Sequence, residues 1–203
     1  MTQNLYLASA SPRRKVILEQ LGIFYTVVNR APGGSRVNEK KPEEFVTAMA
    51  RTKAERAIIP GAPGIVLAAD TIVHIEGEIL GKPKGRGDAV RMLKLLSGRW
   101  HEVYSGLALR DTAAGTLISG HAVTRVRFRD LSREVIEWYC NGPEPFDKAG
   151  AYGIQEIGAV LVDRIEGDFY NVVGLPVGLF VNLLQEIGHP IETIALGYEG
   201  LNP

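Results

Sequence analysis

The sequence predicts an α/β protein in which helices flank a long mixed β-sheet. Strand-like and helix-like segments alternate over the first hundred residues, whereas longer strand-like runs cluster later in the chain. This change of pattern is typical of a sheet with both parallel and antiparallel strands. With 203 residues, the chain is long enough for one domain or for two small lobes.

Capping residues and apolar spacing define the elements expected in the first half of the chain. Ser11 suits a helix N-cap, Pro12 suits the first helical position, and Gly22 suits the end of the same helix. Pro42 opens the next helix, whose apolar face is expected to contain Phe45, Met49, Lys53 and Ala57. The other expected elements are strands over 5–8, 24–28 and 65–69, a polar loop over 29–41, a hairpin over 73–79 that turns at Glu76-Gly77, and a helix over 88–96 closed by Gly98.

Strands dominate the expected second half of the chain. They cover 103–109, 117–128 and 159–165, with a short helix over 134–139 and a final helix from Pro176 to Gly188. Residues 141–158 are rich in glycine and proline, which favours a junction between lobes or a mobile loop at an active site. We expect one domain over 1–190 and a tail over 191–203.

Composition argues against several classes of function. The 23 Lys and Arg residues balance 23 Asp and Glu residues, which disfavours non-specific binding to nucleic acid or to an acidic membrane. No run approaches the ~18 apolar residues of a membrane span. Cys140 is the single cysteine, which excludes an internal disulfide framework and fits a reducing cytosol. The first positive charges follow a short apolar run, the opposite order to a signal peptide, so we expect a cytoplasmic protein.

A cluster of hydroxyls and cations follows the first expected strand. Ser9, Ser11, Arg13 and Arg14 stand where the strand gives way to a helix. Free N–H groups at a helix N-terminus favour anions, whereas arginines there oppose the helix dipole. Their placement makes sense if they bind phosphate, which guanidinium groups contact in bidentate fashion. The alternative is a capped surface helix with two solvated arginines.

Asp70 and Lys53 are the next candidates. Asp70 is expected at the carboxyl end of a buried strand, where open α/β sheets place ligand-binding groups, and it suits a metal ion or a positioned water. The alternative is a turn-forming Asp that caps Thr71 and Ile72. Lys53 lies on the expected apolar face of its helix, where a bare ammonium is costly. Either its stem extends to solvent or its ammonium meets a buried anion.

Other motifs give weaker signals. Gly81-Lys82-Pro83 differs from a phosphate-binding P-loop in its glycine spacing and in its Pro83, which leaves Lys82 as a loose cation at a strand end. Composition alone favours a solvated Glu39. The chain has no GxSxG, HExxH or CxxC motif, and its four histidines are scattered. The remaining Arg, Lys and carboxylate groups at strand ends together suit a metal–polyphosphate substrate.

In combination, these segments resemble the Maf family of nucleotide pyrophosphatases. The matching stretches run in the family's order and cover roughly residues 5–188. They are LASASPRR, the Glu39 loop, Lys53-Ala54, AADTIV, the GKP at 81–83, LSG with His101 nearby, EPFDKAGAYGIQ at 144–155 and NVVGLP at 171–176.

The resemblance implies an α/β fold similar to that of the inosine-triphosphate pyrophosphatases, with two lobes around a deep cleft. It implies hydrolysis of a nucleoside triphosphate to the monophosphate and pyrophosphate, assisted by Mg²⁺ or Mn²⁺, in clearing non-standard nucleotides. It also suggests a homodimer. Arg13, Thr71 and Gln155 fall where the family sets base preference, and the GIQ at 153–155 is similar to the subfamily that prefers dTTP and UTP.

Three positions depart from the family's pattern. Glu156 stands where a glycine usually follows Gln155, Ser105 replaces a usual Thr, and Asn38 replaces a common Asp before Glu39. The carboxylate of Glu156 is one residue from the expected base-reading amide, so it bears on base preference. Asn38 leaves one fewer acidic group for the metal.

The residues allow a mechanism for the implied reaction. Glu39 and Asp70 hold the divalent ion, and Asp70 acts as general base on the water that attacks the α-phosphorus. Gln155 can donate and accept, as pairing with the O4/N3–H edge of uracil or thymine requires. The groups expected to bind the triphosphate are Ser9, Ser11, Arg13, Arg14, Lys53 and Lys82, which must converge on one pocket.

Two alternatives stay open at this point. One keeps the reaction but changes the base, to 7-methyl-GTP or a modified pyrimidine triphosphate. The other is a non-catalytic nucleotide-binding regulator of cell division, since the family has been linked to septum arrest. The carboxylates favour the enzyme, because a pure triphosphate binder gains little from added negative charge unless it recruits a metal.

Overall fold

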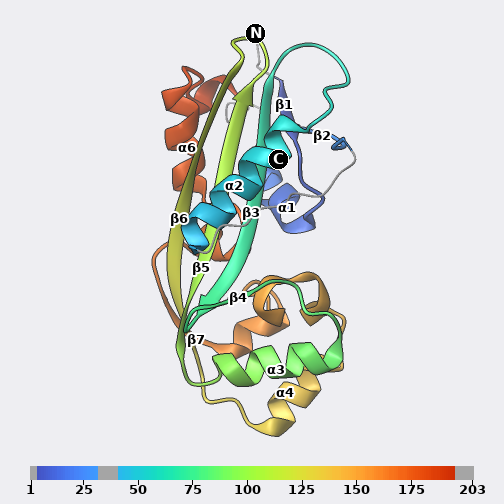
Figure 1. Cartoon of the computed structure of the whole chain (residues 1–203), viewed down its shortest axis with the longest axis vertical. Coiled ribbons are helices and arrows are strands. Elements are labelled where there is room, and N and C mark those ends of the chain that lie inside the picture. Colours follow the sequence, from blue (N-terminus) through green and yellow to red (C-terminus); the bar gives the residue numbers. More distant parts are fainter. Residues whose placement is uncertain (1–3, 32–40, 195–203) are drawn as a thin grey trace, which may run out of the picture. The chain divides into compact units, whose positions relative to one another are not determined.

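The computed structural model of the chain describes residues 4–31 and 41–194 (Figure 1). Over these ranges the strands belong to a single seven-stranded sheet. They are β1 (Leu5–Leu7), β2 (Thr26–Val27), β3 (Ile65–Ile75), β4 (Glu78–Leu80), β5 (Trp100–Asp111), β6 (Thr116–Phe128) and β7 (Val162–Glu166).

Helices connect most of the strands, as the α/β prediction requires. The α-helices are α1 (Pro12–Gln20), α2 (Pro42–Glu55), α3 (Arg86–Leu96), α4 (Arg133–Cys140), α5 (Phe169–Val173) and α6 (Val177–Glu186). Four short 3₁₀ helices follow α4 along the chain, namely η1 (Glu144–Asp147), η2 (Ala149–Ala151), η3 (Ile157–Leu161) and η4 (Ile191–Thr193). Helix α5 was not expected from the sequence.

The sheet is mixed, which confirms the predicted fold class. Its strand order is β2-β1-β3-β5-β6-β7, with β4 paired to β3. Strand β1 runs parallel to both β2 and β3, whereas β4 is antiparallel to β3 and β7 is antiparallel to β6. The turn between β3 and β4 lies at Glu76-Gly77, where both residues have positive φ, as predicted for a tight hairpin.

The chain forms two compact units. Of the described residues, unit 1 comprises 4–31, 41–70, 105–122 and 174–194, and unit 2 comprises 71–104 and 123–173. Three of the four boundaries fall inside β3, β5 and β6, so each of these strands contributes residues to both units, and the fourth follows α5. The expectation of a junction between lobes at 141–158 is therefore wrong, because that segment lies wholly within unit 2.

In unit 1, helix α2 packs very closely against the sheet (Figure 1). Its buried residues are Val46, Ala50 and Ala54, one position along from the predicted apolar face. The sheet residue beneath it is Gly106, where a Cβ atom would overlap the backbone carbonyl of Val46. Small side chains face the sheet because the two backbones nearly touch. Lys53 consequently lies at the edge of the buried face rather than at its centre.

The other two long helices of unit 1 also bury one face each. Helix α1 buries Ile17 and Leu18, whereas Val16 is 42% exposed. Helix α6 buries Phe180, Leu183 and Leu184 and lies against β6, where a Cβ atom added at Gly120 would lie 3.1 Å from Leu179 Cδ1.

Unit 2 has its own apolar core. Helices α3 and α4 pack against each other and against the sheet. Leu93 of α3 and Ile136 of α4 meet Val73, Val103 and Val126 from three neighbouring strands in one cluster of buried side chains. The segment after α4 consists largely of η1, η2 and η3, and its buried residues pack into the same core.

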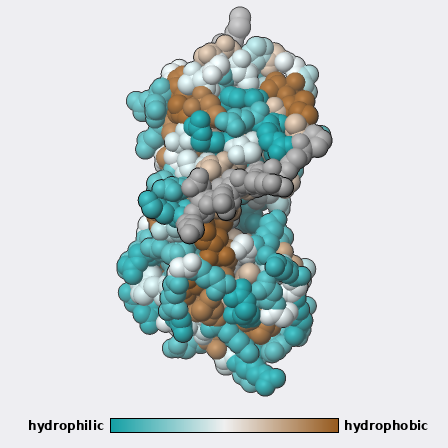
Figure 2. All heavy atoms as spheres, viewed as in Figure 1, coloured by the Kyte–Doolittle hydropathy of each residue, from teal (hydrophilic) through white to brown (hydrophobic). Residues whose placement is uncertain are grey.

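The surface of the molecule is mainly hydrophilic on the face seen in Figure 2, with small apolar patches between the polar side chains. The most exposed large apolar side chain is Phe24, at 69%. Within the described ranges, none of the helices combines the length and the apolar character that crossing a bilayer requires.

We predict that Gly106→Ala destabilises unit 1, because the new methyl group pushes α2 away from the sheet. Overpacking of this kind typically costs about 1–3 kcal/mol of unfolding free energy, measurable by urea denaturation. Gly61→Ala is the matched control, since nothing lies within 4 Å of a Cβ added there. Equal stability of the two variants would contradict the close approach.

Candidate active site

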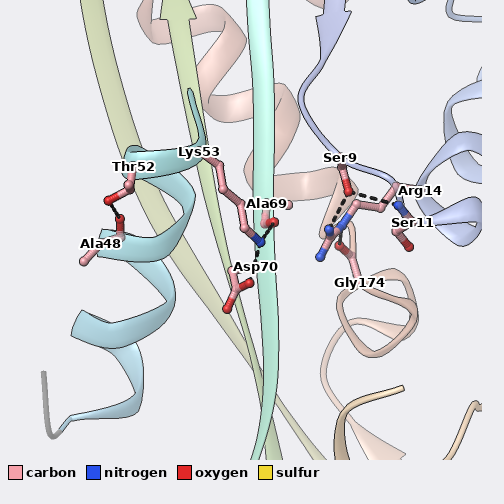
Figure 3. Close-up of polar contacts among 9 residues, drawn as sticks. All are labelled: Ser9, Ser11, Arg14, Ala48, Thr52, Lys53, Ala69, Asp70 and Gly174. Carbon is pink, nitrogen blue, oxygen red and sulfur yellow. Dashed lines mark hydrogen bonds and ion pairs between the residues drawn. The ribbon is translucent and has the colours of Figure 1, made fainter. Parts of the chain in front are cut away.

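The loop between β1 and α1 is held by a buried arginine (Figure 3). Nε of Arg14 donates to the carbonyl of Gly174 at 2.7 Å, and Nη1 donates to Oγ of Ser9 at 2.8 Å. The backbone N–H of Ser11 donates to the same Ser9 Oγ at 3.3 Å. Arg14 therefore fixes Ser9 just before α1 and ties this loop to Gly174, the residue that follows α5.

The two ends of α1 follow the sequence prediction in part. Pro12 is the first residue of α1 and Gly22 follows its end with a φ of 65°, both as predicted. Ser11 occupies the N-cap position, but its hydroxyl makes no capping hydrogen bond, so the predicted capping role is wrong. The hydroxyl that organises the turn is that of Ser9, because it accepts from both Arg14 and the Ser11 N–H.

Lys53 and Asp70 form a buried ion pair. The ammonium Nζ donates to Asp70 Oδ1 at 2.5 Å and to the carbonyl of Ala69 at 3.0 Å. The two side chains are only 14% and 17% exposed. Of the two sequence-based possibilities for Lys53, the ammonium meets an anion and does not extend to solvent. Figure 3 shows it reaching from α2 to β3.

Asp70 does not end a strand, contrary to the prediction. It is an interior residue of β3, which continues through Thr71 to Ile75. The β-branched residues after Asp70 favour an extended backbone, so the strand does not stop at the carboxylate. The turn-forming alternative is also wrong, for the same reason.

The charged groups of unit 1 act on one another. Burial lowers the pKa of Arg14 to about 10, partly offset by the charge of Asp70, while the neighbouring Arg13 lowers it further. Burial also lowers the pKa of Lys53; the charge of Asp70 and its hydrogen bond oppose this shift, whereas Arg14 and Arg30 reinforce it. Within the described ranges, Asp70 is thus the carboxylate whose charge acts on both Arg14 and Lys53.

These charges suit an anionic ligand. Within the described ranges, Asp70 is the carboxylate paired with the largely buried Lys53, and burying a cation is costly unless negative charge lies nearby. Arginine side chains beside the N-terminus of α1 are suited to phosphate oxygens. This part of unit 1 is therefore a candidate site for a phosphorylated compound, with Asp70 as its candidate base or metal ligand.

Asp70 offers one carboxylate to a divalent ion, and within the described ranges no group of three or more His, Cys, Asp or Glu side chains could hold a metal. Oδ1 of Asp70 is bonded to Lys53, and within the described ranges Oδ2 has no hydrogen-bond partner. A carboxylate oxygen is a hard ligand, and Mg²⁺ commonly takes only one or two carboxylates from a protein and completes its shell with waters and substrate phosphates. The second predicted ligand, Glu39, lies outside the described residues.

Three predicted site residues belong to unit 2. Thr71 follows Asp70 on β3, Lys82 is exposed directly after β4, and Gln155 is exposed between η2 and η3. The backbone N–H of Gly150 donates to the carbonyl of Gly81 at 3.1 Å, which links the loop of Lys82 to the segment that carries Gln155. Their contact with substrate stays a prediction.

The buried histidine of unit 2 is not a candidate acid or base. His101 packs edge-on against Phe128 and Tyr152, and its Nε2 lies 2.8 Å from the Tyr152 hydroxyl. Burial lowers the pKa of His101 to about 3, so the imidazole is neutral near pH 7. Cys140 is likewise buried in the core of unit 2.

Sequence reasoning did not single out two participants in unit 1. The backbone carbonyl of Gly174 accepts a hydrogen bond from Arg14, and a backbone contact of this kind cannot be predicted from a side-chain motif. Arg30 adds positive charge near Lys53, but in sequence it is one polar residue of a loop rich in such residues. The NVVGLP stretch contains Gly174 and was the available signal.

Comparison with known proteins agrees with this class of site. Residues 4–187 match the family described as Maf-like protein. The chain is 48% identical to a dTTP/UTP pyrophosphatase of Symbiobacterium thermophilum over 196 residues, which cover 96% of this chain and 100% of the relative. Proteins with the same name from Pyrococcus furiosus and Acetivibrio thermocellus are 42% and 44% identical, over 95% and 91% of this chain and 99% and 95% of theirs. This chain belongs to the Maf family.

We predict that Arg14→Met lowers stability by about 3 kcal/mol, because it leaves the buried Gly174 carbonyl and the Ser9 hydroxyl without their charged donor. Lys15→Met, on the adjacent and partly exposed position of α1, is the control and is expected to change stability by under about 0.5 kcal/mol. Urea denaturation of both variants measures the difference. A loss of unfolding free energy under about 1 kcal/mol for Arg14→Met would show that the hydrogen bonds of Arg14 to Ser9 and Gly174 do not stabilise the fold.

Proposed function

We propose that this protein hydrolyses dTTP and UTP to the nucleoside monophosphate and pyrophosphate. The observation that carries the proposal is the charged cluster of unit 1, in which the Asp70 carboxylate pairs with Lys53 and acts on the charge of Arg14. Full-length relatives in the same family bear the name of this activity. A polyphosphate is the substrate class that this charge distribution fits best.

The chain's own groups divide the work of the reaction. Cations near the start of α1 bind phosphate oxygens, and Arg14 keeps Ser9 in place beside them. Lys53 fixes the orientation of Asp70 through Oδ1, which leaves Oδ2 to accept the proton of the attacking water. The water attacks the α-phosphorus in line with the departing pyrophosphate. Lys82 is proposed to neutralise the developing charge on that leaving group.

A divalent ion, Mg²⁺ or Mn²⁺, is proposed to be held by Asp70 and Glu39. It would neutralise phosphate oxygens and supply Lewis-acid assistance. Its hard oxygen ligands match the carboxylates named, and Asp70 has an uncommitted oxygen within the described part of the chain.

Base preference is proposed to reside with Gln155, together with Arg13 and Thr71. A glutamine amide can pair with the O4/N3–H edge that uracil and thymine share, and a mismatched edge would leave the amide unpaired. Glu156 next to it is exposed and has no ion-pair partner among the described residues. Its charge favours bases that present donors, so modified pyrimidines belong in any substrate panel, as does 7-methyl-GTP.

We further propose that the protein acts in the cytoplasm on free nucleotides and assembles as a homodimer. Nucleic acid is not among its proposed partners. The non-catalytic regulator is the rival class, and release of pyrophosphate from UTP in the presence of Mg²⁺ separates it from the enzyme.

We expect Asp70→Asn to lower the rate of pyrophosphate release from UTP by at least ~10²-fold, the usual scale for a positioned base. The amide can still accept the hydrogen bond of Lys53 but no longer compensates its charge, so the melting temperature is expected to fall, and turnover is measured well below it. Asp163→Asn, on the exposed part of β7, serves as control with parental turnover. Near-parental pyrophosphate release by Asp70→Asn would remove this residue from the chemistry.

Gln155→Ala should change the ratio of rates between bases more than the rate with the best substrate, because the amide is proposed to contact only the base. The measurement is kcat/KM for UTP, dTTP, CTP and 7-methyl-GTP, with pyrophosphate and orthophosphate quantified separately. An unchanged ratio in this folded variant would exclude Gln155 from base recognition.

A further inference from the structure

The segment between α4 and β7 has an exposed tip and a buried anchor. Gln155 and Glu156 are exposed at the tip. The anchor precedes the tip in the sequence: Glu144 and Lys148 are only 7% exposed, although both carry a full charge in water. Charged residues are rarely buried to this degree without a specific role, so the anchor needs an explanation.

Glu144 and Tyr139 hold the two ends of the tip. Oε1 of Glu144 accepts from the backbone N–H of Gly158 at 3.2 Å, and the Tyr139 hydroxyl accepts from the backbone N–H of Gly153 at 3.3 Å. Burial raises the pKa of Tyr139, and so does the nearby charge of Glu144. The two side chains thus hold the backbone before and after Gln155.

Lys148 is the third residue of the anchor. Its Nζ donates to the backbone carbonyl of Glu144 at 2.9 Å and to Oδ1 of Asp147 at 2.8 Å. The stem of Lys148 packs so close to Gly153 that a Cβ there would lie 2.6 Å from Lys148 Cε. At Gly158, a Cβ would lie 2.8 Å from the Tyr139 hydroxyl. The anchor therefore leaves no room for side chains at either end of the tip.

The anchor is costly as a purely structural device. Oε2 of Glu144 is buried and, among the described residues, has no hydrogen-bond partner. Leaving one oxygen of a buried carboxylate unsatisfied typically costs about 1–3 kcal/mol. An apolar side chain would fill the same space without that cost, but it would not bond to the backbone N–H of Gly158.

We propose that Glu144, Tyr139 and Lys148 act together as positioning residues, the Glu144 clamp, which fixes the backbone of residues 153–158 so that Gln155 reads the base of the substrate. This inference rests on the proposed function, because it assigns the clamp to base selection. Recognition through one amide needs placement within about 0.5 Å, and a mobile tip would lose selectivity to ordering entropy.

The clamp itself is tested by hydrogen exchange of the full-length protein without nucleotide. Tyr139→Phe removes only a hydroxyl, and we expect roughly tenfold faster amide exchange at Gly153, the scale of one lost hydrogen bond. Glu144→Ala should do the same at Gly158. The exposed Tyr170→Phe and Glu134→Ala are matched controls with parental exchange at both glycines. Parental exchange in the clamp variants would overturn the clamp, whatever the enzyme's activity.

The link to base selection is tested by nucleotide kinetics. We expect Glu144→Ala and Tyr139→Phe to lower the ratio of kcat/KM for UTP over CTP by about fivefold, mainly through the KM for UTP, while kcat stays within about threefold. Glu144→Gln keeps an oxygen acceptor for Gly158 and should restore most of the ratio. In a Gln155→Ala background, Glu144→Ala should change the ratio no further, since it acts through Gln155.

The outcomes separate the two levels of the proposal. An additive effect of Glu144→Ala in the Gln155→Ala background would show that the clamp is structural only and would overturn its role in selectivity. Absence of pyrophosphate release from any triphosphate by the parent protein would refute the proposed function and the selectivity role with it. The exchange experiment then still decides whether the clamp exists.

Discussion

The ion pair between Lys53 and Asp70 is the contact on which the candidate site depends. Replacing a buried ion pair by apolar side chains of similar volume is often neutral or stabilising, so such a pair is weak evidence of a stabilising role. Here its formation also demands a close helix–sheet approach, which Gly106 and the small residues of α2 permit. Packing in unit 1 is thus arranged to bring one ammonium to one carboxylate.

The arginines extend the same principle from geometry to charge. Arg14 donates hydrogen bonds to Ser9 and Gly174, so part of its guanidinium has a structural role. Its positive charge also lowers the pKa of Lys53. Lys53 is similarly committed to Asp70 and Ala69. A polyanionic substrate relieves the mutual repulsion of these cations without requiring them to move, which is the advantage of a preorganised electrostatic site.

The sequence predicted the elements better than the faces they present. The mixed sheet, the start of α1 at Pro12 and the turn at Glu76-Gly77 followed from local signals. The face of α2 and the position of Asp70 within β3 did not, because both depend on partners distant in sequence. Residues 141–158 were misjudged for a related reason: glycine and proline marked a loop, but the buried charges that anchor it act through the tertiary structure.

Chemistry and selectivity are carried by different sets of contacts. The reacting carboxylate is fixed within unit 1 by α2, whereas the tip that carries Gln155 is fixed within unit 2 by side chains from α4 and η1. Since neither set of hydrogen bonds includes a residue of the other, a change at the tip can alter the base that is accepted without disturbing Asp70. Glu156 is such a change: it stands between the two gripped glycines, exposed, and adds a charge to a backbone that is already held in place. On this proposal, the placement of Asp70 depends on contacts within unit 1, whereas the placement of Gln155 depends on the clamp within unit 2.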